Sequence, residues 1–141
     1  MSILRDCATG AGKHALVVDD EPLVGHIMCE VLEQIGYHVD YAADGDEALQ
    51  FSRSQEYDVV VCDILMPRIN GMALYDIWLD EAPATACRTI FVTGDSLGAE
   101  TTQFVARTGC PCIYKPFKLN DLARVILAVQ KSAEGLATPA K

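Results

Sequence analysis

Apolar residues follow two different spacings along this chain, and the two spacings alternate. Short runs that are apolar on both faces, such as residues 59–62, are typical of strands buried on both sides of a parallel sheet. Between these runs, apolar residues recur at intervals of three and four, which is the pattern of one helical face. The first such face consists of Val24, Ile27, Met28, Val31 and Ile35. The alternation predicts strands at residues 15–18, 37–42, 58–63, 89–93 and 110–114, each followed by a helix.

Turn and cap residues indicate where the predicted helices begin and end. Pro22 suits a first helical turn and Gly36 suits the position just after a helix, so we predict a helix over residues 22–35. Asp44 followed by Glu47 is the pattern of a capping box, at the start of a helix that extends to about Arg53. The remaining helices are predicted over residues 72–80, from a cap at residues 94–96 to about residue 108, and along the apolar face of residues 122–129.

Five β-α units in succession favour an α/β fold, namely a doubly wound, five-stranded parallel sheet with helices on both faces. The connections between strands are expected to be right-handed. The 141 residues suffice for one domain with a substantial core. We assign this domain to residues 13–131, with residues 1–12 as an N-terminal tail or linker and residues 132–141 as a small polar C-terminal tail.

The formal net charge is −9, from 20 acidic and 11 basic residues, and such a chain repels nucleic acid and anionic membranes. We therefore expect no direct binding to nucleic acid. No apolar run approaches the roughly 20 residues that cross a bilayer, and the first residues lack the apolar core of a signal peptide. The six cysteines form neither a C-x-x-C pair nor a zinc pattern with histidine. These features predict free thiols, a cytoplasmic location and no membrane segment.

Residues that can carry chemistry follow four of the five predicted strands. Asp19 and Asp20 follow the first strand, Asp63 ends the third, Thr93 ends the fourth and Lys115 follows the fifth. Each of them alone is also typical of a turn, a cap or a surface position. The carboxyl ends of parallel strands, however, meet at one edge of the sheet, where open α/β sheets bind their ligands. We therefore expect these five side chains to lie together.

The expected cluster suits a divalent cation and a phosphoryl group. Three neighbouring carboxylates repel one another unless a cation lies among them, and Mg²⁺ (or Mn²⁺) prefers such oxygen ligands together with water. A lysine and a threonine hydroxyl beside them suit the oxygens of a dianionic phosphoryl group. Phosphoryl transfer needs this set of groups, and Asp63 is the expected nucleophile.

Four motifs that contain these residues resemble the receiver domain of two-component response regulators. They are V-V-D-D-E-P at residues 17–22, D-I-L-M-P-R-I-N-G-M at residues 63–72, F-V-T-G-D at residues 91–95 and Y-K-P-F at residues 114–117. In this order and spacing the motifs are highly specific, and the resemblance covers roughly residues 13–131. It implies the strand order 2-1-3-4-5 and a cis peptide bond between Lys115 and Pro116.

The resemblance also implies how the domain works. Asp63 takes a phosphoryl group from a phosphohistidine of a histidine kinase or a histidine phosphotransfer domain, and the domain signals by a conformational change. Magnesium is ligated by the side chains of Asp20 and Asp63, by the backbone carbonyl of Leu65, and by Asp19 through water. A homodimer formed on phosphorylation is a further implication.

In the same scheme Thr93 and Lys115 contact the phosphoryl oxygens. The family usually has Tyr or Phe three residues before the lysine as a mobile switch, and here that position is Cys112. Coupling of the usual threonine-to-aromatic kind is therefore not expected. Leu65 lies where many members carry a polar side chain, and we expect this apolar group to alter the rate of dephosphorylation.

Other functions on similar architectures fit the residues less well. A flavin-binding domain needs a phosphate loop rich in glycine and hydroxyls after the first strand, where residues 19–21 are all acidic. Phosphatases with an aspartate nucleophile carry D-x-D, and here the second position is Leu65. A degenerate receiver that acts only as a protein-interaction module stays open because of Cys112.

We expect the chain to promote only its own phosphorylation and dephosphorylation, so it is no enzyme toward a separate substrate. The segment of residues 93–111 resembles receivers at the C-terminal end of hybrid sensor histidine kinases. We therefore expect that the domain is part of such a kinase rather than a free-standing protein.

Overall fold

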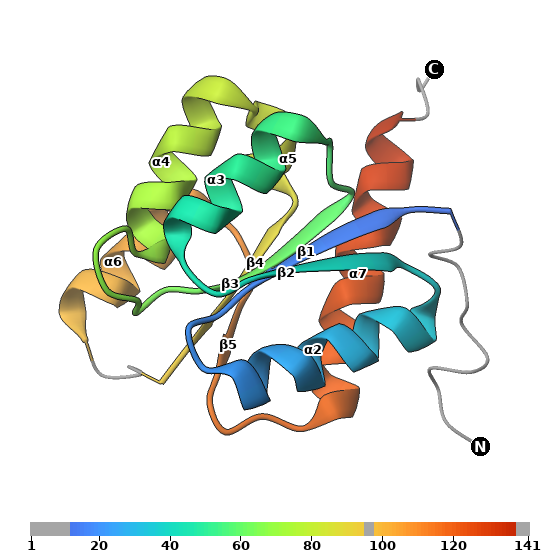
Figure 1. Ribbon diagram of the computed structural model, residues 1–141, viewed down its shortest axis with the longest axis horizontal. Helices are drawn as coiled ribbons and strands as arrows, with labels where there is room; N and C mark the ends of the chain where they lie inside the picture. Colours follow the sequence, from blue (N-terminus) through green and yellow to red (C-terminus); the bar gives the residue numbers. More distant parts are fainter. Residues whose placement is uncertain (1–11, 95–97, 138–141) are drawn as a thin grey trace.

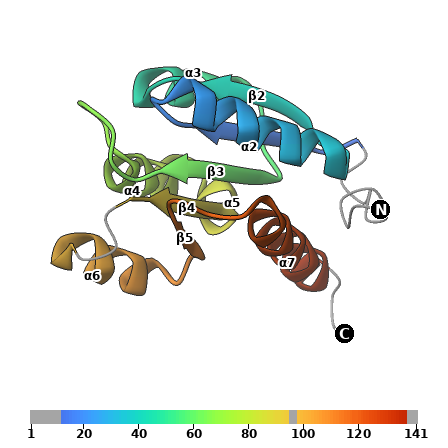
Figure 2. The ribbon, with the colours of Figure 1, turned by 90° about the horizontal axis from the view of Figure 1, so that it is seen from below.

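The computed structural model describes residues 12–94 and 98–137. Five strands in this part of the chain form one parallel sheet in the order β2-β1-β3-β4-β5, which Figure 2 shows from top to bottom. The strands are β1 (His14–Val18), β2 (His38–Ala42), β3 (Val59–Asp63), β4 (Thr89–Thr93) and β5 (Cys112–Tyr114). The predicted α/β class, the parallel sheet and its strand order are confirmed.

Helices cover both faces of the sheet (Figure 1). One face carries α2 (Pro22–Ile35) and α7 (Leu119–Ala137). The other face carries α3 (Gly45–Ser54), α4 (Gly71–Glu81), α5 (Pro83–Cys87) and α6 (Ala99–Thr108). Alternate residues of a strand pack into the two apolar cores, and in β1 Leu16 faces α3 and α4 whereas Val17 faces α2 and α7. Because β1, β3 and β4 are buried on both sides, their sequences are apolar on both faces.

Local sequence signals begin and end most of the helices as predicted. Pro22 is the first residue of α2, and Gly36 ends it in the left-handed conformation with φ of 116°. At the start of α3, Asp44 Oδ1 accepts a hydrogen bond from the backbone N–H of Glu47 at 2.8 Å. The Glu47 carboxylate accepts in turn from the N–H of Ala43, the residue before the cap, rather than from the N–H of Asp44 as in an ideal capping box. Gly109, with φ of 72°, ends α6.

Some boundaries differ from the predictions, and α5 was not predicted at all. Ala82 ends α4, and Pro83 then begins a new helical turn because proline fits the first helical position. Strand β5 starts at Cys112 rather than at Cys110, since Pro111 has no N–H to donate to the ladder. Pro111 takes part only as an acceptor, through its carbonyl, from Phe91 N at 2.9 Å.

Differences also occur at the start of α6 and at the end of α7. Helix α6 begins at Ala99 after Gly98, and the cap predicted at Asp95 and Ser96 lies outside the described residues. Helix α7 continues to Ala137, so part of the segment predicted as a polar tail is helical. That segment contains alanine, glutamate and leucine, which favour a helix once α7 has started. All but the last residue of the predicted N-terminal tail lies outside the described residues.

None of the helices within residues 12–94 and 98–137 is both long enough and apolar enough to cross a membrane.

Candidate functional site

The chemistry-bearing residues lie where β1, β3, β4 and β5 end at their carboxyl termini. Asp63 and Thr93 are the last residues of β3 and β4, while Asp19 and Lys115 directly follow β1 and β5. The parallel register brings these strand ends together, and Lys115 N donates a hydrogen bond to the carbonyl of Thr93 at 2.8 Å. The sequence prediction that these residues share one edge of the sheet is correct.

The ammonium group of Lys115 binds three carboxylates at this edge. Its Nζ lies 3.2 Å from Asp63 Oδ2, 3.3 Å from Asp19 Oδ2 and 2.9 Å from Glu21 Oε1. The first two carboxylates are almost completely buried, whereas Glu21 is exposed. The sequence analysis did not assign Glu21 to the site. Its place directly after Asp20 was a usable signal, because the turn after β1 carries all three acidic residues to the same edge.

Burial and mutual repulsion make the two inner carboxylates harder to ionise. The pKa of Asp63 is raised to about 6, chiefly by burial and also by the charge of Asp19, although Lys115 and a hydrogen bond from Leu65 N oppose the change. Burial likewise raises the pKa of Asp19. Burial alone would lower the pKa of Lys115, but its hydrogen bond to Glu21 and the charges of Asp63 and Asp19 outweigh this and raise it. The lysine therefore stays charged, and the site lacks positive charge relative to its carboxylates.

The acidic cluster fits a divalent cation such as Mg²⁺. Carboxylate oxygens of Asp19, Asp20 and Asp63 all lie within 4.8 Å of one another. Asp19 Oδ1 accepts a hydrogen bond from Glu21 N at 2.8 Å, whereas the buried Asp19 Oδ2 has the Lys115 ammonium group 3.3 Å away and no aligned hydrogen bond from the described residues. Lys115 shares its one positive charge among three carboxylates, so a bound cation would complete the neutralisation of this buried oxygen. Oxygen donors of this kind, one of them open to solvent at Asp20, are the ligands that magnesium prefers.

Asp63 presents its two oxygens to different groups. Oδ2 faces Lys115, and Oδ1 accepts a hydrogen bond from the backbone N–H of Leu65 at 3.1 Å. The Leu65 backbone is therefore beside the predicted phosphoacceptor, while its side chain is 47% exposed. The ligand role of the Leu65 carbonyl stays a prediction. Thr93 is fully buried at the end of β4, and its role toward a phosphoryl group also stays a prediction.

A close backbone contact behind Asp63 holds the loop that follows β3. Gly71 N donates a hydrogen bond to the carbonyl of Ile64 at 2.8 Å. A Cβ atom on Gly71 would lie 2.8 Å from both the Asp63 carbonyl oxygen and the Ile64 Cα, which is too close for any side chain. The sequence indicated a turn here but not this contact. Because glycine is required, the start of α4 can pack directly against the backbone at the end of β3.

Cys112, at the position where the family usually has an aromatic residue, is half buried on β5. It packs against the apolar core beneath α3, α4 and α6, and it pairs with Phe91 in the β4–β5 ladder. Burial raises the pKa of its thiol, although a hydrogen bond with Tyr114 opposes the change. The thiol therefore stays protonated and behaves as a small packing group. Lys115–Pro116 is a cis peptide bond, as the resemblance implied.

Comparison with known proteins agrees with this site. Residues 15–127 match the family model of the response regulator receiver domain. A probable transcriptional regulator, ycf27 of Cyanophora paradoxa, is 44% identical over 129 residues, which cover 86% of this chain and 50% of that protein. Two-component system protein A of Emericella nidulans is 29% identical over 117 residues, covering 81% of this chain and 17% of that protein. The chain thus spans half or less of the length of these two relatives.

Solved structures share the same fold. A CheY-like response regulator receiver domain protein of Methanospirillum hungatei superposes with a TM-score of 0.79 at 27% identity, over 87% of this chain and 97% of that one. The signal receiver domain of a signal transduction histidine kinase of Syntrophus aciditrophicus gives a TM-score of 0.77 at 26% identity, over 92% and 97% of the two chains. With four site motifs, the strand order and a family match over most of its length, this chain belongs to the response regulator receiver domains of two-component signal transduction.

Proposed function

We propose that this receiver domain accepts a phosphoryl group on Asp63 from a phosphohistidine of a histidine kinase or a histidine phosphotransfer domain. The observation that carries the proposal is the placement of Asp63 Oδ2, 3.2 Å from the Lys115 ammonium group and in a cluster with Asp19 and Asp20. A carboxylate so placed has a fixed cation beside it and room for a metal ion. Receiver domains in general are phosphoacceptors, which adds weight to this assignment.

The transfer exchanges one bond to phosphorus for another. An oxygen of the Asp63 carboxylate attacks the phosphorus atom, the P–N bond to the donor imidazole breaks, and the imidazole leaves with the electron pair of that bond and takes up a proton. Lys115 neutralises the negative charge that arrives with the phosphoryl group, and we assign the Thr93 hydroxyl to one of its oxygens. Hydrolysis later returns Asp63 and inorganic phosphate, with water as the incoming group.

Magnesium is the cofactor that we assign to the acidic cluster. Asp20 and Asp63 would hold it by their side chains, the Leu65 carbonyl would be a third protein ligand and Asp19 would bind through water. When bound, the ion supplies positive charge that neutralises the phosphoryl oxygens. The support on this chain is the convergence of three carboxylates, with the one ammonium group of Lys115 shared between Asp19, Asp63 and Glu21.

The donor protein has an apolar surface to dock on beside Lys115. A groove of about 390 Å³ is lined by Val24 and Ile27 of α2 and by Pro116, Phe117 and Leu119 after β5. Leu23, which precedes the lining residue Val24 on the first turn of α2, is 80% exposed. Because Lys115 lines the same groove, a helix that binds there would bring its histidine close to Asp63. Burial of these side chains would supply the binding energy.

We further propose the finer features expected from the sequence. The domain would catalyse no reaction beyond its own phosphorylation and dephosphorylation, would work in the cytoplasm, and would extend over residues 13–131. It would be part of a hybrid histidine kinase and would form a homodimer on phosphorylation. Cys112 in place of an aromatic residue means that the phosphorylation signal would be transmitted differently from the usual rotation of an aromatic ring.

Intact-protein mass spectrometry after incubation with acetyl phosphate tests the proposal. The wild type, with Mg²⁺, should gain the mass of a single phosphoryl group, and the Asp63→Asn variant should gain none. Without Mg²⁺ the adduct should be absent from both. If no adduct forms although calorimetry detects Mg²⁺ binding, the assay is repeated with a phosphorylated histidine kinase as donor. An adduct of equal size in Asp63→Asn, or neither adduct nor Mg²⁺ binding in the wild type, would contradict the phosphoacceptor assignment.

A further inference from the structure

A second group of ligating side chains lies at the opposite edge of the sheet. His14 and His38 are the first residues of β1 and β2, and they are direct partners in the parallel register of these strands. Partners in register point to the same face of a sheet, and the two imidazole centroids are only 5.4 Å apart, with an angle of 31° between the rings. Strand β1 thus begins at this histidine pair and ends next to Asp19, so the pair is separated from the phosphoacceptor site by the length of the strand.

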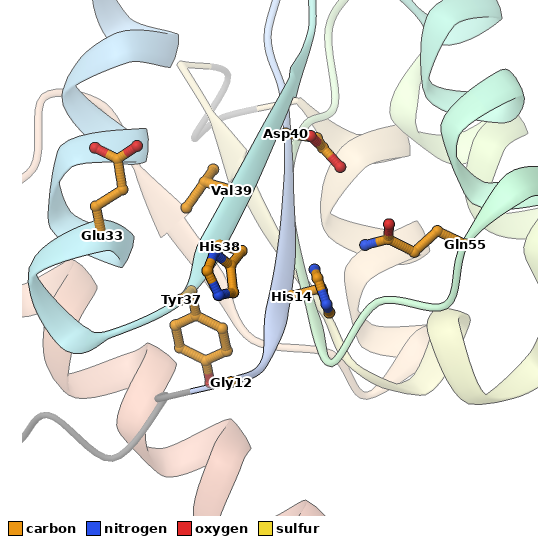
Figure 3. Close-up of a pocket in the computed structure, with 8 residues that line it drawn as sticks. All are labelled: Gly12, His14, Glu33, Tyr37, His38, Val39, Asp40 and Gln55. Atoms are coloured by element: carbon orange, nitrogen blue, oxygen red, sulfur yellow. The ribbon is translucent and has the colours of Figure 1, made fainter.

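The histidine pair lines a polar cavity of about 550 Å³ at the edge of β2 (Figure 3). Glu33 from α2 and Asp40 from β2 contribute carboxylates to the same cavity, and the lining residues that the structure describes include no lysine or arginine. His38 is exposed and His14 is partly exposed, so an ion can reach both rings from solvent. The negative lining favours a cation over an anion.

Backbone and side-chain hydrogen bonds hold the pair in place. His38 N donates to the carbonyl of Lys13 at 2.8 Å, and His14 N donates to Asp58 Oδ2 at 2.9 Å. The N–H of Asp58 returns a bond to the His14 carbonyl at 2.7 Å. These contacts fix the two strands relative to each other. The two rings are therefore held close together by the backbone of β1 and β2, with 5.4 Å between their centroids.

A side-chain amide without a hydrogen-bond partner among the described residues lies next to the pair. Gln55 follows α3, and Figure 3 shows its amide pointing toward His14. The Nε2 atom of this amide is buried and has no hydrogen-bond partner among the described residues. A buried N–H group without an acceptor is costly, and a water or an anion held on a bound metal ion would satisfy it.

We propose that His14 and His38 bind one divalent transition-metal ion of the Zn²⁺ type. Imidazole nitrogen is a preferred ligand of Zn²⁺, Cu²⁺ and Ni²⁺, whereas Mg²⁺ prefers oxygen, so this site and the acidic cluster select different ions. Two imidazoles on a tetrahedral ion, with zinc–nitrogen bonds of about 2.0–2.1 Å, place their ring centroids roughly 5 Å apart. The observed 5.4 Å is close to this separation.

The site is open rather than closed. Among the described residues, the one group of three or more histidine, cysteine or carboxylate ligands that converges is the cluster of Asp19, Asp20 and Asp63. The ion at the histidine pair would therefore complete its coordination with water, one molecule of which can accept the bond from Gln55. An ion bound by both histidines would link the first residues of β1 and β2 and so stabilise the pairing of the edge strand β2 with the sheet.

Zn²⁺ titration of the full chain, in buffer with saturating Mg²⁺ to fill the acidic cluster, tests this proposal. Calorimetry should detect one Zn²⁺ equivalent whose affinity falls at least about tenfold in His14→Gln and in His38→Gln, since even an outer-shell partner is commonly worth 10–100-fold. His26→Gln is the matched control, because His26 is the third histidine of the chain and packs on Tyr41 instead. The affinity of the His26→Gln variant for Zn²⁺ should equal that of the wild type. Nitrogen NMR of the rings should show Zn²⁺ shifting His14 and His38 but not His26.

Several results would overturn the assignment. They are the absence of Zn²⁺ binding to the wild type, equal binding in all three variants, and binding that disappears on alkylation of the cysteines while the ring resonances stay unshifted. Because His14 is partly buried, its variant could fold poorly, so Mg²⁺ binding and circular dichroism must match the wild type. His38 is exposed on an edge strand, and its variant keeps the test decisive if the His14 variant fails this check.

Discussion

Lys115 Nζ lies 3.2 Å from Asp63 Oδ2, although the two residues are 52 positions apart in the chain. The β4–β5 ladder sets the position of the lysine, and β3 sets that of the aspartate. The pairing of the strands in the sheet therefore sets this distance. This one contact supplies the fixed positive charge in a site that is otherwise made of carboxylates.

Removal of this charge should destabilise the protein in the absence of metal. In Lys115→Ala, Asp19 and Asp63 remain buried without their cation, and we expect the free energy of unfolding at pH 8 to fall by roughly 1–3 kcal/mol, less than for a fully buried pair because the lysine is partly exposed. Urea unfolding measures this, and Mg²⁺ should restore part of the loss. Arg53→Ala, which breaks the exposed pair with Glu81, is the control and should lower the free energy of unfolding far less than Lys115→Ala does. Equal losses in the two variants would contradict the prediction.

The raised pKa of Asp63 predicts that the metal-free protein loses stability as pH rises. The pKa of Asp63 is about 6 in the folded state, above the ordinary value of 3.8, so the folded protein holds this proton more tightly than the unfolded chain does. The stability that the protonated carboxyl contributes is therefore fully present at low pH and is lost as pH rises through about 6. Asp63→Asn removes the charge and should raise the free energy of unfolding by roughly 1–3 kcal/mol at pH 8, with a gain that shrinks toward pH 4.

Chemical denaturation of both proteins at several pH values checks this, with Asp80→Asn on the exposed side of α4 as the charge-matched control. The increase in the free energy of unfolding should occur in Asp63→Asn but not in Asp80→Asn. It should also become smaller when Mg²⁺ is added. A gain that grows toward low pH has the wrong sign for a raised pKa and would exclude the explanation by burial and repulsion.

Gly71→Ala should be strongly destabilising. The new Cβ would contact the Asp63 carbonyl and the Ile64 Cα at 2.8 Å, and both of these are backbone atoms that cannot rotate away. We expect a loss of about 2 kcal/mol or more in urea unfolding, together with weaker phosphorylation because the loop after Asp63 must shift. Gly94→Ala is the matched control, since a Cβ there meets nothing within 4 Å. A loss in Gly94→Ala as large as in Gly71→Ala would show that the contact is not the cause.

If Lys115 binds the phosphoryl group as proposed, Glu21 should compete with that group for the lysine. Its Oε1 is 2.9 Å from Lys115 Nζ, and its charge also repels an anionic phosphodonor at the mouth of the site. Glu21→Gln should therefore accelerate phosphorylation by acetyl phosphate severalfold at constant, saturating Mg²⁺. Glu30→Gln, at an exposed position of α2, the helix that begins directly after Glu21, should leave the phosphorylation rate unchanged. A slower reaction in Glu21→Gln would instead make this carboxylate part of the metal site.

Residues whose effect is local were predicted well from the sequence. The ends of α2 follow from Pro22 and Gly36, and the start of α3 follows from Asp44 and Glu47, because a proline ring, a left-handed glycine and a side-chain cap act within a few residues. The edge that gathers the site was also predictable, because apolar runs of strand length followed by polar residues imply a parallel sheet.

Boundaries that depend on competing local signals were harder to predict. At Pro83 the same residue can end one helix or begin another, and here Ala82 ends α4 while Pro83 begins α5. The extension of α7 beyond Ser132 came from the good helix formers that follow it, although the composition of the segment resembled a tail.

The sequence by itself determined the fold class, the family and the edge of the sheet where Asp19, Asp63 and Lys115 meet, because these depend on periodicity and on short motifs. Only the tertiary structure brought Glu21 to Lys115, required glycine at position 71 behind Asp63, and paired His14 with His38. Each of these contacts depends on the relative position of two chain segments at a resolution of about one ångström. The order of residues along the chain does not give the distance between two such segments. That distance is set only when the strands pair in a common register and the helices pack on the sheet.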